Sequence, residues 1–478
     1  MHNYRTKSSD RESREKYRVA ENIIQYNRPG EQMPLPLFKF PNNGNGNGRT
    51  AFRDSAFGEN KNLPLHRWVP WIAGYSASFV DDVISSYLGH RRTSALVIDP
   101  FCGVGTTLLQ AVLRGHNAIG VEINPYPALV ARTKLSALTM DLAKLDSTLL
   151  SIRKASGKWQ NGLVPAGIHP PPLKSRLPFF SVKVENQVLH ALQFINRIGS
   201  EAISNLFRAA FGAVMVSFSN YSYEPSLGSR LAAGKPLIEN ADVAQILLSK
   251  LYQMRTDIAW IQGETKGKNL GRGEVVHSDF FQENDRIEAG TVDLMVTSPP
   301  YMNNYHYVRN TRPQLYWLNF VSSPTEQKSL ETQNFGPYWQ NVREAAPVAL
   351  KFDLRDLERT LKKLRETRVD KGAYGGPGWA NYVASYFNDC FRFMAALNRL
   401  LATGGVGVVV IGNSIIQGLD IRTERILGEI GVMQGLILEG IHCIREKRVG
   451  ASITRSSVRY GEKNNAVLSE WAVVVKKQ

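Results

Sequence analysis

One stretch of this chain, SALVIDPFCGVGTTLLQAVLRGHNAIGVEINP at residues 94–125, constrains the fold more than any other. Residues 95–98 predict a buried strand, and residues 106–113 have the spacing of a helix. A second apolar run, 118–121, predicts another strand, which ends at Glu122. A strand, a glycine-containing turn, a helix and a second strand in this order are typical of parallel, doubly wound sheets. The sequence therefore predicts an α/β fold.

Two long insertions interrupt the pattern of the sheet. Residues 141–270 are helical in pattern and basic in places, and strand-like sequence returns only with GEVVHSDFF at 273–281. Residues 321–378 are polar and include KFDLRDLERTLKKLRETRVDKG, which predicts a solvated helix. We therefore expect one Rossmann-like domain with a large, mainly helical insertion and a smaller polar one. The sheet domain is expected in three pieces, 61–140, 271–320 and 379–478.

Composition bears on location and partners. The chain has 58 Lys and Arg against 42 Asp and Glu, a net charge of +16, which favours a polyanionic partner such as nucleic acid. Its three cysteines form no CxxC pair, so neither a zinc site nor a disulfide framework is indicated. Residues 1–60, which include PNNGNGNGRT, predict a flexible arm. The polar start and the lack of a long apolar run predict a cytoplasmic protein without a membrane segment.

The turn DPFCGVGTT joins the first strand to the first helix. Gly103 and Gly105 let backbone amides approach a ligand at a helix N-terminus, as in sites for dinucleotides, nucleotides or an adenosylated cofactor. The spacing is neither G-x-G-x-x-G nor G-K-[ST], which disfavours nicotinamide and triphosphate ligands. Glu122, about 20 residues further on, is placed to accept hydrogen bonds from ribose hydroxyls. Asp279, which follows the next strand, could bind an adenine amino group or cap its own loop.

The strand TVDLMVT at 291–297 ends in a second turn, Ser298-Pro299-Pro300-Tyr301. We expect this turn near the glycine turn, because ligands of such sheets bind beyond the carboxyl ends of the strands. The two prolines stiffen the backbone, so the Ser298 hydroxyl and the Pro299 carbonyl point at a fixed place. Tyr301 supplies a flat face for a planar ring. Two acceptors beside an aromatic face fit the exocyclic amino group of a nucleobase.

With DPFCGVGTT followed by TSPPY, the chain resembles the S-adenosylmethionine-dependent DNA methyltransferases that act on cytosine N4 or adenine N6. Further resemblance lies in WVPWIAGYSASFVDDVI, YMNNYHYVRNTRPQLYW and GGVGVVVIGNS. It implies a methyltransferase sheet, S-adenosyl-L-methionine as cofactor, double-stranded DNA as substrate and a base flipped out of the duplex. It also implies DNA methylation within a restriction-modification system, with a cognate restriction endonuclease as a candidate partner.

The resemblance assigns roles to individual residues. The implied catalytic set is Ser298, Pro299, Pro300 and Tyr301. The implied cofactor set is Asp99, Phe101, Gly103, Gly105, Thr106, Glu122 for the ribose, Asp279 for the adenine, and Ser76 and Phe79 toward the methionine end. In this family Ser often precedes Pro-Pro-Tyr in cytosine-N4 enzymes, so Ser298 favours cytosine N4. The insertion at 141–270 is the expected target-recognition region, and no metal site is expected.

Three alternatives to cytosine-N4 methylation stay open. Adenine-N6 methylation of DNA is the first. An RNA guanine-N2 methyltransferase is the second, since such enzymes can share a DPFCGxGT turn, although they usually carry DPPY. A DNA-binding relic without activity is the third, although all the key motifs are intact in this chain.

Several other residues are open to two interpretations. The basic segments 174–176, 265–272 and 445–459 could contact phosphates or form solvated surface, and the last has the pattern of a β-hairpin. Cys102 adjoins the glycine turn but is interpreted as a packing residue. Four aromatic residues either border the base pocket or lie in the core: Tyr305, Tyr307, Tyr316 and Trp317.

Overall fold

The computed structural model describes residues 52–53, 57–71, 74–89, 93–160, 162–223, 226–303, 305–448 and 467–478. They belong to the unit Thr50–Gln478, whereas the other unit of the chain, Met1–Arg49, lies outside them. The predicted arm at 1–60 therefore falls mostly outside the described residues. The same holds for the part of the predicted hairpin that follows residue 448.

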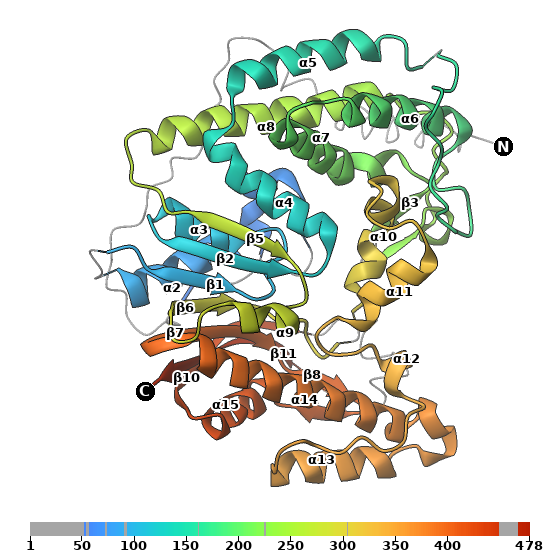
Figure 1. Ribbon diagram of the computed structural model, residues 1–478. Coiled ribbons are helices and arrows are strands. Elements are labelled where there is room, and N and C mark those ends of the chain that lie inside the picture. The colour runs from blue at the N-terminus through green and yellow to red at the C-terminus, as the bar shows by residue number, and fades with distance from the viewer. Residues whose placement is uncertain are drawn as a thin grey trace, which may run out of the picture. The chain divides into compact units, whose positions relative to one another are not determined.

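A mostly parallel sheet lies at the centre of the described chain (Figure 1). In the part of the chain that the structure describes, the sheet has seven strands, in the order β10-β11-β7-β6-β1-β2-β5. β11 runs antiparallel to both of its neighbours, and the other adjacent pairs are parallel. The strands are β1 (Leu96–Asp99), β2 (Asn117–Glu122), β5 (Gly273–His277), β6 (Val292–Thr297), β7 (Leu401–Gly412), β10 (Leu436–Arg448) and β11 (Val467–Lys477). The predicted α/β fold with a doubly wound sheet is confirmed.

The order of the strands reverses beside β1. From β1 the chain builds outward through β2 to β5, and then it crosses back to place β6 on the opposite side of β1. Such a reversal opens a crevice at the carboxyl ends of the two strands, because their connections leave in opposite directions. The glycine turn after β1 and the proline turn after β6 therefore meet at one edge of the sheet.

Helices cover both faces of the sheet, which is why its central strands are apolar on both sides. Leu294 and Val296 of β6 belong to one buried cluster, and Met295 between them belongs to another. The helices that share the first cluster are α2 (Ala77–Leu88), α3 (Thr106–Leu113) and α4 (Pro125–Ser136). Those that share the second include α14 (Gly376–Leu400) and α15 (Thr423–Met433).

The segment between β2 and β5 is mainly helical, and its apolar side chains form one buried cluster together with Trp68, Val104 and Leu109. Its long helices are α5 (Leu142–Ser156), α6 (Val182–Asn196), α7 (Glu201–Val214) and α8 (Val243–Thr265), which Figure 1 shows beside the β5 edge of the sheet. A small hairpin, β3 (Tyr221–Tyr223) and β4 (Leu227–Ser229), lies between α7 and α8 in the chain. Apolar side chains of these helices pack with α10 (Tyr307–Trp317), which follows the proline turn. The insertion therefore reaches the segment next to the predicted catalytic turn.

The second insertion contains α11 (Pro324–Thr332), α12 (Trp339–Val342) and α13 (Arg355–Glu366). α13 differs from the solvated helix that the sequence predicts. Leu357, Leu361 and Leu364 are buried in the same cluster as α14, while the charged side chains of α13 occupy its other positions. The three leucines have helical spacing, so this apolar stripe was visible in the sequence beneath a high content of charge.

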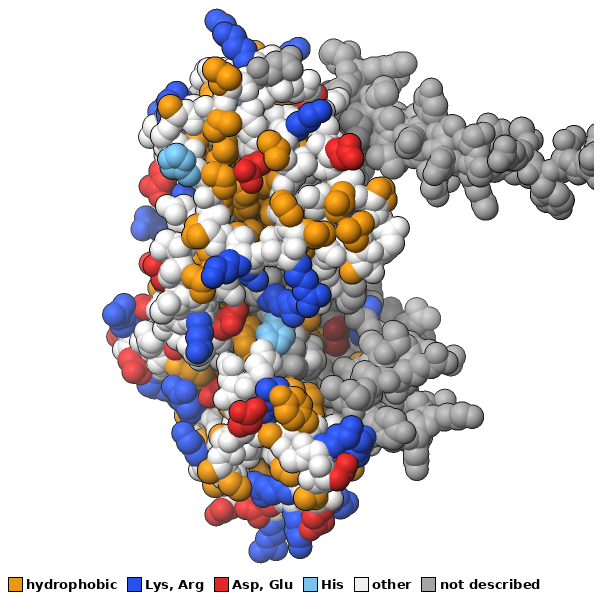
Figure 2. Space-filling model, turned by 90° about the vertical axis from the view of Figure 1, so that its right-hand side faces the viewer, with side chains coloured by type: hydrophobic (Ala, Val, Ile, Leu, Met, Phe, Trp, Pro, Cys, Tyr) orange, Lys and Arg blue, Asp and Glu red, His pale blue; other side chains and the backbone are white. Residues whose placement is uncertain are grey.

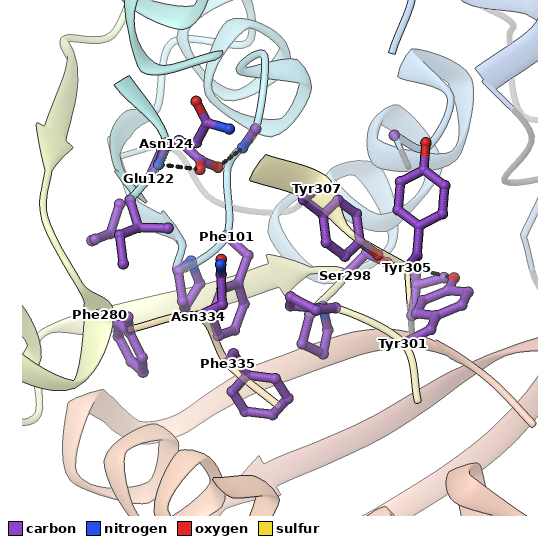
Figure 3. A pocket seen from close by; sticks show the side chains of 18 of the residues that line it. Phe101, Glu122, Asn124, Phe280, Ser298, Tyr301, Tyr305, Tyr307, Asn334 and Phe335 are labelled. Atoms are coloured by element: carbon purple, nitrogen blue, oxygen red, sulfur yellow. Dashed lines mark hydrogen bonds between the residues drawn. The ribbon is translucent and has the colours of Figure 1, made fainter. Parts of the chain in front are cut away.

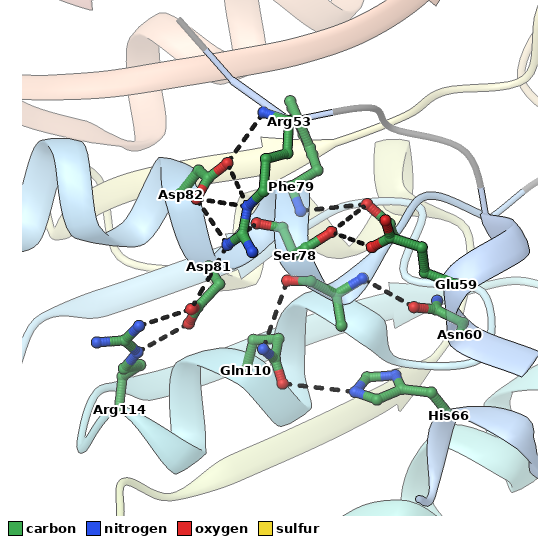
Figure 4. A network of polar contacts seen from close by, with 12 residues as sticks. Arg53, Glu59, Asn60, His66, Ser78, Phe79, Asp81, Asp82, Gln110 and Arg114 are labelled. Carbon is green, nitrogen blue, oxygen red and sulfur yellow. Dashed lines mark hydrogen bonds and ion pairs between the residues drawn. The ribbon is translucent and has the colours of Figure 1, made fainter. Parts of the chain in front are cut away.

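A network of polar contacts joins α2 to α3 and to the segment around Asn60 (Figure 4). The Asn60 side chain donates to the Tyr75 carbonyl at 3.0 Å and accepts from the Ala77 amide at 2.9 Å. Arg114 pairs with Asp81 at 2.6 Å, which ties α3 to α2. These two hydrogen bonds of Asn60 also fix the position of Tyr75, which borders the site described below.

The remaining short elements connect these layers. They are α9 (Phe280–Glu283), the hairpin β8 (Ser414–Ile416) with β9 (Leu419–Ile421), and short 3-10 turns such as Phe57–Lys61 and His66–Trp68. None of the helices in the described ranges has the length and apolar character needed to cross a membrane. Within those same ranges, His, Cys, Asp and Glu side chains form no cluster of three or more that could hold a metal ion.

Candidate active site

A cavity of about 290 Å³ opens at the carboxyl ends of β1, β2, β5 and β6. Most of its lining residues come from the ends of these strands, from the segment that follows the proline turn, and from 333–335 in the second insertion. Figure 3 shows Glu122 at one end of the cavity and Tyr301 at the other, with Asn334 between them. The glycine turn and the proline turn that the sequence singles out therefore border one space.

The glycine turn depends on backbone conformations that suit glycine. Gly103 has φ +49° and Gly105 has φ +79°. A Cβ on Gly105 would lie 2.8 Å from the Cβ of Ala131 on α4, so a side chain there would push the two helices apart. Gly103 lines the cavity and donates its N–H to Glu122 Oε2 at 2.9 Å.

Asp99 and Thr106 lie in the same turn but are buried behind the cavity wall. Asp99 Oδ2 accepts from the Tyr75 hydroxyl at 2.7 Å, and Oδ1 accepts from the Thr297 hydroxyl at 2.6 Å and from the Phe101 amide at 3.2 Å. Burial raises the pKa of the Asp99 carboxyl. Asp99 therefore joins the end of β1 to the end of β6. The last residue of β6, Thr297, immediately precedes the proline turn.

Glu122 is the acid at the end of β2. Its Oε2 holds the Gly103 amide, and its Oε1 accepts from the Asn124 amide at 2.8 Å, as Figure 3 shows. Burial raises the pKa of Glu122 from 4.5 to about 7, against the lowering effect of these two amides. A carboxyl group with such a pKa is poised to ionise when a ligand offers it hydrogen-bond donors.

Asp279 and a set of aromatic rings form the adjoining wall. Asp279 Oδ1 accepts from the Phe281 amide at 3.0 Å, so it caps α9, and the same residue also lines the cavity. Both interpretations of this residue are thus compatible with its position. Phe101 and Phe280 lie with ring centroids 5.9 Å apart, and Phe335 lies 5.1 Å from Phe101. Together they give an apolar surface on which a flat ring could rest.

The proline turn forms the other end of the cavity. The Ser298 hydroxyl lies 3.5 Å from the Tyr301 hydroxyl, and the Pro300 carbonyl accepts a hydrogen bond from Tyr386 at 2.9 Å. A Cβ on Gly412 of β7 would lie 3.1 Å from two carbons of the Tyr301 ring, so the absence of a side chain at this position leaves room for the ring. Burial raises the pKa of the Tyr301 hydroxyl well above its ordinary value. Tyr301 is therefore a neutral aromatic surface.

The structure does not bring every predicted residue to the cavity. The buried Ser76 hydroxyl accepts from the Phe79 amide at 3.1 Å and caps α2, and Phe79 is fully buried in the core. Cys102 is buried, and its side chain lies where a Cβ on Gly120 would clash with it, which agrees with a packing role.

The four aromatic residues left open by the sequence divide into two pairs. Tyr305 and Tyr307 line the cavity, with ring centroids 5.0 Å apart. Tyr316 and Trp317 are buried in the cluster shared with the helical insertion.

Several lining residues were missed in the sequence. Gln333, Asn334 and Phe335 belong to the polar insertion, and Glu470 lies on β11 opposite Arg445, which belongs to the predicted basic segment 445–459. No local motif marks them, because they reach the cavity only through the packing of distant segments. Phe280 and Asn124 could have been found, since each lies within two residues of a predicted acid at a strand end.

Comparison with known proteins bears on the family. No family model matches the sequence. The chain is 26% identical to the type II methyltransferase M.BsoBI of Geobacillus stearothermophilus, over 78% of this chain and 79% of that protein. It is 22% identical to the type II methyltransferase M.AvaI of Nostoc sp., over 81% and 82% of the two chains. It is 25% identical to the type II methyltransferase M.MvaI of Kocuria varians, over 70% and 73%. Over most of its length, the chain is related in sequence to type II methyltransferases.

Proposed function

We propose that this protein is an S-adenosylmethionine-dependent DNA methyltransferase that modifies the exocyclic amino group of a flipped base, with cytosine N4 as the preferred target. One observation carries the proposal: Gly103 and Glu122 line the same cavity as Ser298, Pro299 and Tyr301. A methyl donor bound at the first turn would face an amine bound at the second. The similarity to type II methyltransferases supports the same class of reaction.

The residues at the Glu122 end fit S-adenosyl-L-methionine. The two oxygens of the Glu122 carboxylate are suited to accept from two ribose hydroxyls. Asp279 would accept from the adenine amino group, and Phe101 and Phe280 would flank the adenine ring. Gly103 lets the backbone approach the ligand without a side chain in between. When bound, the cofactor would supply an electrophilic methyl group on its sulfonium sulfur.

The proline turn would hold the target amine. The Ser298 hydroxyl and the Pro299 carbonyl can each accept one amine hydrogen, which favours a pyramidal nitrogen with an available lone pair. Tyr301, supported by Gly412, would stack on the base. Held in this way, the amine nitrogen would attack the methyl carbon that the bound cofactor supplies, the electron pair of the broken carbon–sulfur bond would leave with the S-adenosylhomocysteine product, and one amine proton would pass to solvent. Positioning would supply most of the rate enhancement, so no covalent nucleophile is needed.

Basic side chains beside the cavity support a nucleic-acid substrate. Figure 2 shows Lys and Arg side chains gathered near the middle of one face. Arg309 and Arg312 lie on α10, within about one and a half turns of Tyr307 of the cavity wall. Arg312 also donates to the Lys174 carbonyl in one of the predicted basic segments. Arg445, from another such segment, lines the cavity itself. These groups would bind the phosphates that flank a flipped base.

The residue before Pro-Pro-Tyr distinguishes the candidate target bases. Ser298 favours cytosine N4, and adenine N6 is the first alternative because both amines present the same two hydrogens to the turn. The helical segment between β2 and β5 would carry target recognition, and a cognate restriction endonuclease would be the partner in the cell.

Mass spectrometry of nucleosides from DNA of expressing cells tests the proposal. The expected product is N4-methylcytosine, absent from cells that carry a Tyr301→Ala variant. N6-methyladenine would establish the alternative target instead. Methyl label transferred to tRNA and not to duplex DNA would indicate the RNA enzyme. Cofactor binding without methylation of any DNA would leave a binding relic and refute the proposed reaction.

A further inference from the structure

Tyr386 on α14 contacts the proline turn directly. Its hydroxyl donates to the Pro300 carbonyl at 2.9 Å, and its side chain is almost completely buried. The sequence pattern places Tyr386 on the apolar face of its helix, which accounts for its burial but not for this polar contact. Pro300 lies between the Pro299 carbonyl and the Tyr301 ring, so a fixed Pro300 peptide restrains the two groups that would hold the base.

The same tyrosine also supports the segment from the second insertion that lines the cavity. Gly336 has φ +67°, and a Cβ there would lie only 2.7 Å from the Tyr386 ring. Phe335 meets that ring edge-on, with centroids 5.6 Å apart and planes at 84°. The Gly336 amide donates to Asp389 Oδ2 at 3.1 Å, one helical turn further along α14. The close packing of Gly336 and Phe335 thus determines where Asn334 enters the cavity.

We propose that Tyr386 is a positioning residue that holds both the proline turn and the 333–336 segment in register with the cavity. The inference rests on the proposed function for its catalytic consequence, since the proline turn would present the acceptors of the target amine. Its hydroxyl fixes the end of the cavity that would receive the base. Its ring fixes the segment that lies between this end and Glu122 (Figure 3).

The two contacts can be removed separately. Tyr386→Phe deletes the hydrogen bond to Pro300 and keeps the ring against Gly336. We expect single-turnover methyl transfer to fall by about tenfold or more, because small displacements of reacting groups are costly. The Kd for S-adenosylhomocysteine should stay within about twofold of the native value, a difference of about 0.4 kcal/mol. Tyr382→Phe, which removes the hydroxyl of another buried tyrosine one turn earlier on the same helix, is the matched control.

Gly336→Ala perturbs the other contact. The added Cβ must displace the segment or the Tyr386 ring, so we expect the Kd for S-adenosylhomocysteine to rise by about tenfold. Gly234→Ala is the control, since Gly234 also has a positive φ, +69°, but an added Cβ there would have no neighbour within 4 Å. If Tyr386 and Gly336 were needed only for stability, both variants would lower the melting temperature. Tyr386→Phe would then not selectively lower the rate, and Gly336→Ala would not selectively raise the Kd.

Hydrogen exchange measured by mass spectrometry makes the test independent of activity. In Tyr386→Phe, the peptide that begins at Tyr301 should exchange faster than in the native protein, and it should not do so in Tyr382→Phe. If the native protein methylates no DNA, the proposed function fails, and exchange still decides the role of Tyr386. Unchanged exchange of that peptide, or native methyl transfer by Tyr386→Phe, would overturn the inference.

Discussion

The affinity of this protein for its proposed cofactor should depend on pH through Glu122. Burial raises the pKa of Glu122 from 4.5 to about 7. At about 1.4 kcal/mol per pH unit, this difference corresponds to roughly 3 kcal/mol against ionisation in the free protein. Ribose hydroxyls donate hydrogen bonds, so they bind the ionised carboxylate and lower its pKa. Binding below pH 7 must therefore release a proton.

The magnitude follows from the fraction of Glu122 that is ionised. With a pKa of about 7, ionisation rises about tenfold between pH 6 and pH 8, so the Kd for S-adenosylhomocysteine should fall by about tenfold over this range. Isothermal titration calorimetry at several pH values would measure the Kd. Repeating it in buffers with different ionisation enthalpies would count the protons released.

Two variants give the measurement its controls. The side chain in Glu122→Gln cannot ionise. The Kd of this variant should therefore be higher than the native value at pH 8 and independent of pH. Glu424→Gln changes another buried glutamate, on α15 and outside the cavity lining, and it should keep the native pH profile. A native Kd that is equal at pH 6 and pH 8, with no proton released, would refute the assignment of Glu122 to the ribose.

The same pKa affects the stability of the free protein. The folded state binds a proton on Glu122 more readily than the unfolded chain does. The stabilising contribution of the protonated carboxyl is therefore fully present below about pH 4.5 and is lost as the pH rises through about 7. Chemical unfolding of the native protein and of Glu122→Gln at pH 5 and pH 8 should show the native protein losing more stability across this interval.

Other perturbations address the acceptor end and the DNA surface. Tyr301→Ala should bind S-adenosylhomocysteine normally in calorimetry yet lose methyl transfer, and full activity would exclude a stacking role. Gly412→Ala places a Cβ 3.1 Å from the Tyr301 ring, so the single-turnover rate should fall by about tenfold while cofactor affinity is kept; an unchanged rate would show that the ring tolerates displacement. Arg309→Ala, on the exposed side of α10, should weaken DNA binding and reduce the salt slope in a fluorescence titration by about one; an unchanged slope would place the phosphates elsewhere.

Much of the fold can be predicted from short stretches of the sequence. Apolar runs of strand length, the turn with Gly103 and Gly105, and the helix after it predicted the parallel sheet, because each feature depends on residues close together in the chain. The two turns could also be predicted to meet, since the carboxyl ends of parallel strands share one edge. The same local logic was misleading for α13, where charge obscured the buried stripe at Leu357, Leu361 and Leu364.

The completed cavity required contacts that no local pattern encodes. Asn334 and Phe335 come from an insertion that looked merely polar, and Tyr386 looked like an ordinary core residue of a helix. Asp99, in contrast, was expected at the ligand but braces β1 to β6 from behind the wall. Spacing along the chain reveals which face of an element is apolar. It does not reveal which distant segment covers that face, because this depends on how the side chains of the assembled layers fill space together.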